Sequence, residues 1–213
     1  MPQSLDWARK WVTDSAKVIA DNREYLIELD RQIGDGDHGE NLDRGFTAVV
    51  RGDGLKSAET AQDLLKYVAK MLLSTVGGAA SPLYGTAYLR AASEVSGEEL
   101  KPEQVGAMLV AATQGVQARG KAVAGEKTMV DAWLPAADAA CAAADEGVLA
   151  AFEAAAFAAE AGAEATKPLK ASKGRASYLG QRSIGHLDPG AVSSALILRS
   201  AADAAQEIYG QES

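Results

Sequence analysis

The chain has 213 residues, of which 47% are apolar and 23% charged, and we expect one domain over residues 1–213. The formal net charge of −8 argues against a nucleic-acid partner, because such a surface needs a basic patch to neutralise phosphates. No charged start followed by an apolar run opens the sequence, and no apolar stretch is long enough to cross a membrane. The single Cys141 cannot form an internal disulfide, so these features predict a cytoplasmic protein without membrane contact.

Apolar residues recur at helical spacing along the first half of the chain, beginning with Trp7. A Gly- and Asp-dense break at 30–39 fits neither a helix nor a strand pattern. Beyond it, Gly77-Gly78 interrupts the periodicity, and Pro82 follows where a first helical turn tolerates proline. The helices of this half are expected at 5–29, 41–50, 57–73 and 82–95.

The second half of the chain is also helical in pattern, with Pro102 in the first turn of a helix that ends near Gly120. A loop is expected at 121–127 and a Gly- and Ser-containing stretch at 173–189, and Ala-rich segments between them predict close helix packing. The helices of this half are expected at 101–120, 131–146, 147–171 and 191–209. Because strand alternation and hairpin dipeptides are missing, we predict an all-α, single-domain bundle of about eight helices.

The Gly- and Asp-dense break contains the first candidate site. Asp30, Asp35 and Asp37 lie within eight residues, and glycines between them let the backbone fold back. Three hard oxygen ligands suit magnesium, which shares its remaining positions with phosphates and lets an acidic chain hold a nucleotide. The alternative is a solvated acidic turn whose carboxylates hydrogen-bond the backbone, and the residues alone leave both interpretations open.

Three common nucleotide or metal motifs are excluded. Gly34-x-Gly36-x-x-Gly39 satisfies the dinucleotide fingerprint, but it follows a helix and includes carboxylates that would repel a pyrophosphate. A calcium loop fails because no Glu occupies its twelfth position. A near P-loop ends in Ala122, where magnesium binding needs a hydroxyl.

A basic segment before the last helix is the second candidate site. Lys173, Arg175 and Arg182 lie among Gly and Ser residues, a composition typical of a phosphate-binding loop. The alternative is a solvated loop with capping residues, and the composition does not decide between them.

Several blocks of the sequence resemble the ADP-binding subunits of dihydroxyacetone kinase, the DhaL family. They occur in the family's order, span nearly the whole chain, and are specific together although no single block would be. The blocks are Leu29–Asn41, Gly77-Gly78-Ala79 with Pro82–Thr86, Arg119-Gly120-Lys121 with Gly125–Met129, and Gly174–Gly180 with Asp188-Pro189-Gly190.

The resemblance implies a barrel of eight antiparallel helices with the nucleotide bound at one end. It assigns Asp30, Asp35 and Asp37 to two magnesium ions that hold ADP or ATP, and it adds Arg175 to the catalytic group. The nucleotide-contacting positions that it implies are His38, Gly39, Glu40, Asn41, Ala79, Ala80, Gly120, Met129, Arg175, Asp188, Pro189 and Gly190. Ala80 departs from the family pattern, which has a serine there, so a side-chain hydrogen bond is lost unless Ser81 replaces it.

The resemblance also implies an activity, that of a phosphotransferase, a glycerone kinase subunit that is not complete without its substrate-binding partner. Bound ADP would accept a phosphoryl group from a phosphohistidine donor of the phosphotransferase system and pass it to dihydroxyacetone on a separate subunit. One alternative is a subunit of an ATP-dependent kinase for dihydroxyacetone or another small ketose. Another is a nucleotide-sensing adaptor, for which a regulatory protein would be a partner.

Overall fold

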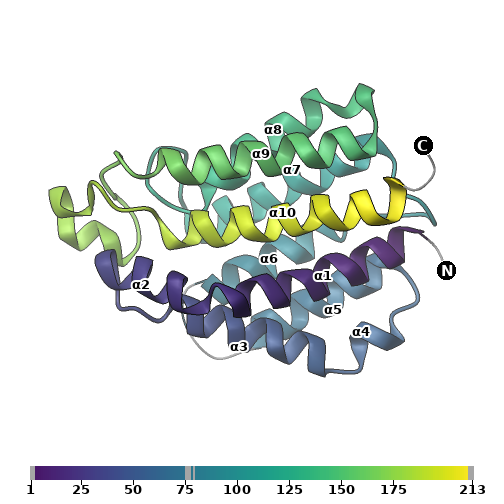
Figure 1. The fold of residues 1–213 in the computed structure, drawn as a ribbon, viewed down its shortest axis with the longest axis horizontal. Helices are drawn as coiled ribbons and strands as arrows, with labels where there is room; N and C mark the ends of the chain where they lie inside the picture. Colours follow the sequence, from purple (N-terminus) through teal and green to yellow (C-terminus); the bar gives the residue numbers. More distant parts are fainter. Residues whose placement is uncertain (1–2, 75–77, 79, 211–213) are drawn as a thin grey trace.

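The computed structural model describes residues 3–74, 78 and 80–210, and every regular element in this part of the chain is helical, as predicted. Figure 1 shows helices along the long axis of the molecule, with α1 beginning and α10 ending at the same end. The α-helices are α1 (Gln3–Asp21), α2 (Arg23–Ile33), α3 (His38–Arg51), α4 (Gly54–Ser57), α5 (Ala61–Ser74), α6 (Ala80–Ala91), α7 (Pro102–Gly120), α8 (Val130–Ala142), α9 (Val148–Ala165) and α10 (Pro189–Tyr209). Two 3₁₀ segments are η1 (Ala144–Glu146) and η2 (Arg175–Ser183). None of the described helices has the length and apolarity needed to cross a bilayer.

The described residues form ten α-helices, where about eight were expected. The segment predicted as one helix over 5–29 is broken at Asn22, where the backbone leaves the helical path (φ −100°, ψ 9°). The Asn22 side chain donates to the Val18 carbonyl at 2.8 Å, a local bond that competes with helix continuation. The four-residue α4 is the other addition, so the long helices still follow the predicted order.

Several predicted helix boundaries are wrong by three or more residues, among them the ends of α6, at Ala91 instead of near 95, and of α8, at Ala142 instead of near 146. Helix α2 continues to Ile33 instead of ending near 29, because the Ile33 side chain is buried at the end of its apolar face. Helix α3 begins at His38 instead of near 41, so only residues 34–37 remain of the expected break. Helix α9 ends at Ala165 instead of near 171, ahead of Pro168, whose ring disfavours helix in the residues before it.

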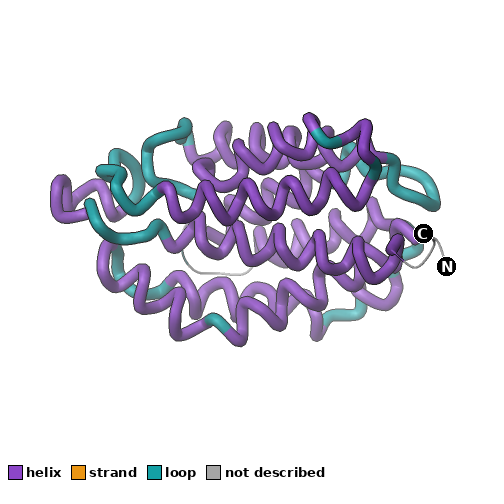
Figure 2. The backbone as a smooth tube through the Cα atoms, turned by 45° about the horizontal axis from the view of Figure 1, so that its top comes forward, coloured by secondary structure: helices purple, strands orange, loops and turns teal. Residues whose placement is uncertain are grey.

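The helices form a closed ring in which chain neighbours pack side by side. Helices α5 to α10 follow one another around this ring, and α1 closes it by packing against both α10 and α5. Helix α3 packs against α1, α5 and α6, and α2 lies against α3 and η2. Figure 2 shows these neighbouring helices aligned along one axis, which places alternate loops at the same end of the bundle.

Aromatic residues of α1 lock it onto α10 inside the ring. Trp7 and Trp11 stack with ring centroids 5.1 Å apart. Their indole N–H groups donate to α10 carbonyls, Trp7 to Ala201 at 3.1 Å and Trp11 to Ile197 at 2.9 Å. These buried side chains therefore combine apolar burial with satisfied polar atoms.

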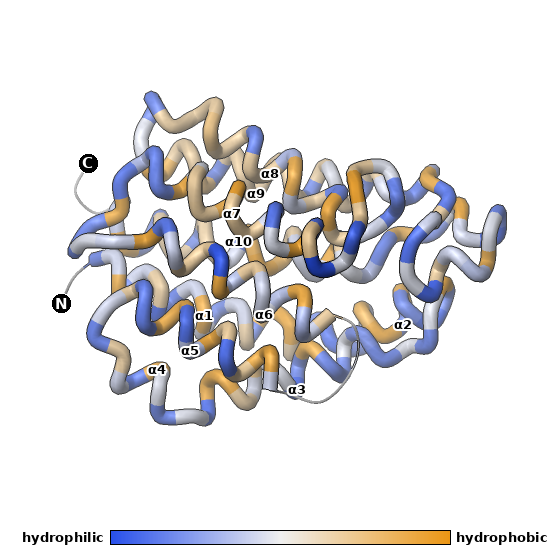
Figure 3. Tube along the Cα trace, turned by 180° about the vertical axis from the view of Figure 1, so that it is seen from behind, coloured by the Kyte–Doolittle hydropathy of each residue, from blue (hydrophilic) through white to orange (hydrophobic). Residues whose placement is uncertain are grey.

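The Ala-rich helices α8 and α9 pack closely, as the sequence predicts. Ala136, Ala140 and Ala159 are buried, and a Cβ at Gly162 would lie 2.1 Å from the Asp131 carbonyl oxygen. Figure 3 shows α7, α8 and α9 mostly in the pale shades between white and orange, since small residues dominate them. Small side chains let these helix backbones approach one another closely.

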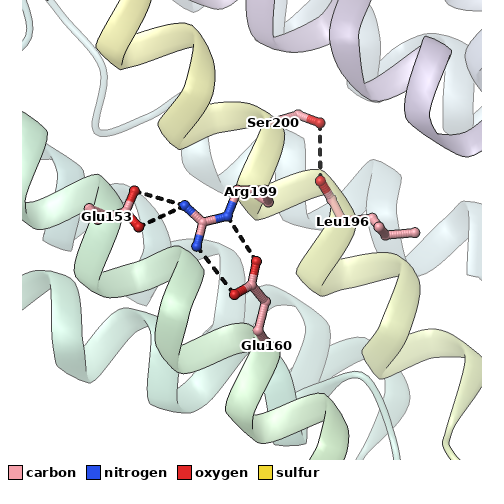
Figure 4. A network of polar contacts seen from close by, with 5 residues as sticks. All are labelled: Glu153, Glu160, Leu196, Arg199 and Ser200. Carbon is pink, nitrogen blue, oxygen red and sulfur yellow. Dashed lines mark hydrogen bonds and ion pairs between the residues drawn. The ribbon is translucent and has the colours of Figure 1, made fainter. Parts of the chain in front are cut away.

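An ionic network joins the outer faces of α9 and α10. Arg199 Nη1 donates to both carboxylate oxygens of Glu153 at 2.8 and 2.7 Å, and Nε donates to Glu160 at 2.8 Å. Figure 4 shows the guanidinium between the two carboxylates. The Glu153 and Glu160 side chains are 64% and 45% exposed, so the network lies at the surface.

Candidate functional site

The acidic loop between α2 and α3 is folded tightly around Asp30. Helix α2 closes at Gly34, whose N–H donates to the Asp30 carbonyl at 2.5 Å. A Cβ at Gly34 would lie 2.2 Å from Asp30 Oδ1, and Gly36 has a φ of 75°, so both positions favour glycine. The N–H groups of Asp37 and His38 donate to Asp30 Oδ2 at 2.8 and 3.2 Å. Asp30, in the last turn of α2, therefore organises the start of α3.

Three carboxylates meet at this loop. One oxygen from each of Asp30, Asp35 and Asp37 lies within 4.8 Å of the others. Burial raises the pKa of Asp30 above its usual value, the two neighbouring carboxylates raise it further, and the backbone N–H donors oppose them. A divalent cation would relieve this crowding of charge, and an oxygen-only ligand set suits magnesium. The donor chemistry thus fits the metal predicted from the sequence.

The basic segment lies beside the acidic loop, because η2 packs against α2. Figure 1 shows both at the end of the molecule opposite the start of α1. Arg175 Nη2 lies 3.1 Å from Asp35 Oδ2, and its side chain is 69% exposed. Arg175 and Lys173 line the same cavity as the aspartates, whereas Arg182 does not. The fold therefore brings together most of the two clusters singled out in the sequence.

A cavity of about 440 Å³ opens between the acidic loop, η2 and the starts of several helices. Ligand pockets in proteins span roughly 300 to 1,000 Å³, so the cavity suits a ligand of nucleotide size. The predicted site residues that line it are Asp30, Asp35, Asp37, His38, Asn41, Ala80, Met129, Arg175, Asp188, Pro189 and Gly190.

The remaining predicted contact positions lie elsewhere or outside the described residues. Gly39 is buried where a Cβ would lie 2.2 Å from a carbonyl oxygen of α2, and Glu40 is exposed. Both belong to the first turn of α3, whose backbone N–H groups lack intrahelical acceptors. Gly120 ends α7, and a Cβ there would lie 3.3 Å from Leu83, which lines the cavity. Ala79 lies outside the described residues.

Four helices begin at the cavity wall. Helix α3 starts at His38, the described part of α6 at Ala80, α8 directly after Met129, and α10 at Pro189, and all four residues line the cavity. Helix starts carry N–H groups without intrahelical acceptors and the positive end of the helix dipole. The cavity therefore combines carboxylates that suit a cation with helix ends that suit phosphate oxygens.

One buried donor also faces this region without a partner. Asn41 lines the cavity, and its Nδ2 is buried with no hydrogen bond to any described residue. Its Oδ1 accepts from Arg44, which fixes the orientation of the amide. An oxygen atom of a bound ligand would satisfy this donor.

The family of the chain follows from its sequence. A family model described as the DAK2 domain matches residues 32–203, which is most of the chain. The chain belongs to the DAK2 domain family. This DAK2 domain is 42% identical over 197 residues to the "PEP-dependent dihydroxyacetone kinase 1, ADP-binding subunit DhaL" of Listeria innocua, covering 92% of this chain and 95% of that one. It is also 42% identical over 200 residues to the "PEP-dependent dihydroxyacetone kinase, ADP-binding subunit DhaL" of Escherichia coli K12, with the same shares of each chain.

A solved structure has the same fold as this DAK2 domain. It is the "dihydroxyacetone kinase from C. freundii in complex with AMP-PNP and Mg2+", with a TM-score of 0.69 and 22% identity. The match covers 93% of this chain but only 33% of that chain, so the DAK2 domain corresponds to about a third of that kinase. At this identity the likeness shows the fold alone.

A buried lysine of the DAK2 domain was missed by sequence reasoning, which placed it in a loop. Lys127 is 1% exposed, and its Nζ donates to the carbonyls of Thr166 at 2.7 Å, Leu169 at 3.2 Å and His186. Burial lowers the pKa of Lys127 from its usual value. The ammonium group therefore ties the α9–η2 connection to the cavity wall. A lysine within a polar loop gives no sequence signal of this role.

Two buried ionisable residues, Asp188 before α10 and His38 at the start of α3, form hydrogen bonds at these helix starts. Asp188 caps α10 by accepting the Ala191 N–H at 2.7 Å, and burial raises the pKa of Asp188 to about 7. Burial lowers the pKa of His38 to about 4, and its Nε2 lies 2.8 Å from Ser193 Oγ. Both side chains thus shape the helix starts that face the cavity.

Proposed function

We propose that this DAK2 domain is the ADP- and magnesium-binding phosphoryl-transfer subunit of a dihydroxyacetone kinase. Bound ADP accepts a phosphoryl group from a phosphohistidine donor of the phosphotransferase system and passes it to dihydroxyacetone on a separate subunit. The observation that carries the proposal is the cavity where three carboxylates face four helix starts. The relatives that are 42% identical over nearly their whole length are named ADP-binding subunits of PEP-dependent dihydroxyacetone kinases.

Asp30, Asp35 and Asp37 would hold two magnesium ions in this proposal, and these ions neutralise phosphate charge when bound. The starts of α3 and α10 would offer to the phosphate oxygens those first-turn N–H groups that Asp30 and Asp188 do not already accept. Arg175 Nη2 lies 3.1 Å from Asp35 Oδ2. Cations bound by the aspartates would compete with Arg175 for this carboxylate. The guanidinium, released from that carboxylate, then steadies the terminal phosphate.

The proposal divides the work between subunits. The polar residues of the cavity suit cations and phosphates, and the proposal places the ketone on a separate dihydroxyacetone-binding subunit. The chain is then a single nucleotide-binding domain over 1–213 that acts between a donor and an acceptor protein, with a regulatory protein as a further partner. The exposed free thiol of Cys141 suits a reducing, cytoplasmic location.

One alternative function is supported by a specific observation. The C. freundii kinase of the same fold was solved with AMP-PNP and Mg2+, an ATP analogue and its metal. In that version the domain exchanges nucleotide at each turnover and serves an ATP-dependent kinase for dihydroxyacetone or another small ketose.

Reconstitution of the transfer reaction separates these functions. The purified chain, a dihydroxyacetone-binding subunit and a phosphorylated phosphohistidine donor are mixed with ADP at a concentration equal to the chain, and dihydroxyacetone phosphate is measured. We expect many turnovers without ATP, and a loss of roughly 100-fold or more in Asp37→Ala. Asp43→Ala, on α3 but outside the cavity, is the matched control. Turnover with ATP alone and none with the donor would favour the alternative, and full activity of Asp37→Ala would contradict both.

A further inference from the structure

A buried hydrogen-bond network lies beneath the cavity and joins the four helices that begin there. It comprises five side chains at the site end of the bundle: His38 of α3, Tyr84 of α6, Trp133 of α8, and Ser193 and Ser194 of α10. Tyr84, Ser193 and Ser194 are fully buried, and Trp133 is 2% exposed. Each of the four helix starts at the cavity therefore contributes at least one member.

Tyr84 is the centre of this network. Its hydroxyl lies 2.7 Å from Ser193 Oγ and 2.8 Å from Ser194 Oγ, and it also contacts the Gly190 carbonyl at 3.3 Å. Ser193 leads on to His38 at 2.8 Å, and Ser194 accepts from the Trp133 indole at 2.9 Å. The Tyr84 hydroxyl thus links the His38 branch to the Trp133 branch.

The donors and acceptors of the network have a consistent direction. Trp133 can only donate, so Ser194 accepts from it. Burial keeps His38 neutral at pH 7, and its ring bonds the backbone of Pro189, which has no N–H and can only accept. One ring nitrogen therefore donates to Pro189 and the other accepts from Ser193, whose oxygen accepts in turn from Tyr84. Ser194 then donates to the Tyr84 oxygen, so each hydroxyl donates its one proton within the network, a condition under which buried polar networks hold one arrangement.

The network is connected directly to residues of the cavity wall. The Gly190 carbonyl oxygen, in the first turn of α10, lies 3.2 Å from Ser193 Oγ and 2.7 Å from Ser194 Oγ. Trp133 lies one turn into α8, where its backbone N–H donates to the Met129 carbonyl at 3.0 Å. Gly190, Met129 and His38 all line the cavity. A change in the network would therefore displace the groups that face a ligand.

We propose that Tyr84 is a positioning residue, whose hydroxyl holds the starts of α3, α6, α8 and α10 in the arrangement that binds the nucleotide phosphates. The proposal rests on the proposed function and names a residue that touches no ligand. Its physical basis is that backbone N–H groups bind an anion well only when they converge, and small displacements of such groups are costly.

Tyr88 provides a matched control one turn along the same helix. It is as fully buried as Tyr84, and Tyr88→Phe removes the same atom from the same helix. The Tyr88 hydroxyl is close to Ser15 of α1 and is not part of the network. Both substitutions remove one buried hydroxyl from α6, but only that of Tyr84 is hydrogen-bonded, so the pair separates loss of the network from loss of a buried hydroxyl as such.

The first test measures ADP affinity in the presence of MgCl₂ by titration calorimetry for the full chain and the two variants. We expect Tyr84→Phe to weaken ADP binding about tenfold or more. Tyr88→Phe is expected to stay within about twofold of the wild type, because it removes a buried hydroxyl that has no hydrogen-bond partner among the described residues. Equal affinities of the two variants would overturn the proposal. The wild-type chain alone tests the proposed function, because a wild-type chain that binds no ADP would contradict it.

The second test reads the network itself by NMR, using the three tryptophan indole N–H signals. Trp7 and Trp11 donate to backbone carbonyls of α10, so their signals are internal references, whereas Trp133 donates into the network. We expect Tyr84→Phe to shift the Trp133 signal and the His38 ring signals and to leave the references in place. Ser193→Ala, which cuts the His38 branch alone, should also weaken ADP binding but shift the Trp133 signal less. Unchanged Trp133 and His38 signals in Tyr84→Phe would overturn the proposal, as would unaltered ADP affinity in Ser193→Ala.

Discussion

Helix α10 carries two polar networks of opposite character. At its start, Ser193 and Ser194 belong to a buried, neutral network centred on Tyr84. One to two turns later, Arg199 bridges Glu153 and Glu160 on the outer surface (Figure 4). Both join α10 to neighbouring helices, but only the first excludes water. The burial of a polar network, rather than its formal charge, therefore decides whether it can hold the residues of a site in one arrangement.

The physical reason lies in the cost of breaking each network. A buried donor or acceptor that loses its partner costs about 1–3 kcal/mol, so the site-end network has few acceptable alternatives. An exposed ion pair contributes about 0–1 kcal/mol, because water and salt replace its partners. Hydrogen bonds to Glu160 and Glu153 raise the pKa of Arg199, which stays charged whether or not the network forms. The outer network therefore holds α9 and α10 together without specifying the cavity.

Removal of the buried ammonium of Lys127 should have the largest effect on stability. Lys127→Met leaves the carbonyls of Thr166, Leu169 and His186 without their donor. We expect unfolding free energy to fall by about 3 kcal/mol and the thermal midpoint by roughly 6–12 °C, measured by calorimetry. Lys121→Met is the matched control, since Lys121 also has a positive φ (51°) but is exposed. Equal midpoints of the two variants would show that the burial of Lys127 has no energetic consequence.

The neutral state of His38 should make stability depend on pH. Because burial lowers the folded pKa of His38 to about 4 from 6.5, its contribution is present above pH 6.5 and lost as pH falls towards 4. Urea unfolding should show that the wild type loses about 1.5 kcal/mol more than His38→Gln between pH 6.5 and 5. The same substitution at His186, which lies partly exposed, is the control. Parallel pH profiles for the wild type and His38→Gln would contradict the buried, neutral imidazole.

Loss of the outer network should have the smallest effect. Arg199→Met removes both carboxylate contacts, and we expect a change of less than about 1 kcal/mol in unfolding free energy. Since these contacts are screened by salt, the difference from the wild type should shrink further in 0.5 M NaCl, roughly a value at which the Debye length falls below 5 Å. ADP affinity should be unchanged. A loss of ADP binding comparable to that of Tyr84→Phe would mean that the outer network also shapes the cavity.

The acidic loop could be recognised in the sequence, whereas the buried network around Tyr84 could not. Asp30, Asp35 and Asp37 are close in the chain, so their spacing alone indicates a candidate cation site, although the family resemblance was needed to decide between a metal site and a solvated acidic turn. The network around Tyr84 draws on residues from four helices, and each of them is an ordinary core residue when considered singly. Their association depends on how the helices pack, which helical periodicity does not specify. The same limit applies to Lys127, whose burial depends on the return of the chain after α9.

The order of the long helices was predictable, because it depends on local sequence pattern. Amphipathic periodicity located the long helices, but it did not detect the break at Asn22, because the residues on either side keep the same apolar face. The start of α3 was missed because a buried histidine and glycine give no apolar signal in the sequence; His38 bonds Ser193 of α10, and Gly39 lies against the backbone of α2.

The central claim is that the three aspartates hold the metal that retains the nucleotide. Native mass spectrometry of the chain, purified without added nucleotide, tests it directly before and after EDTA and in Asp37→Ala. We expect a mass equal to protein plus ADP and two magnesium ions, loss of both on chelation, and an empty Asp37→Ala variant with unchanged helix content. ADP that remains bound after EDTA treatment, or in Asp37→Ala, would contradict the account.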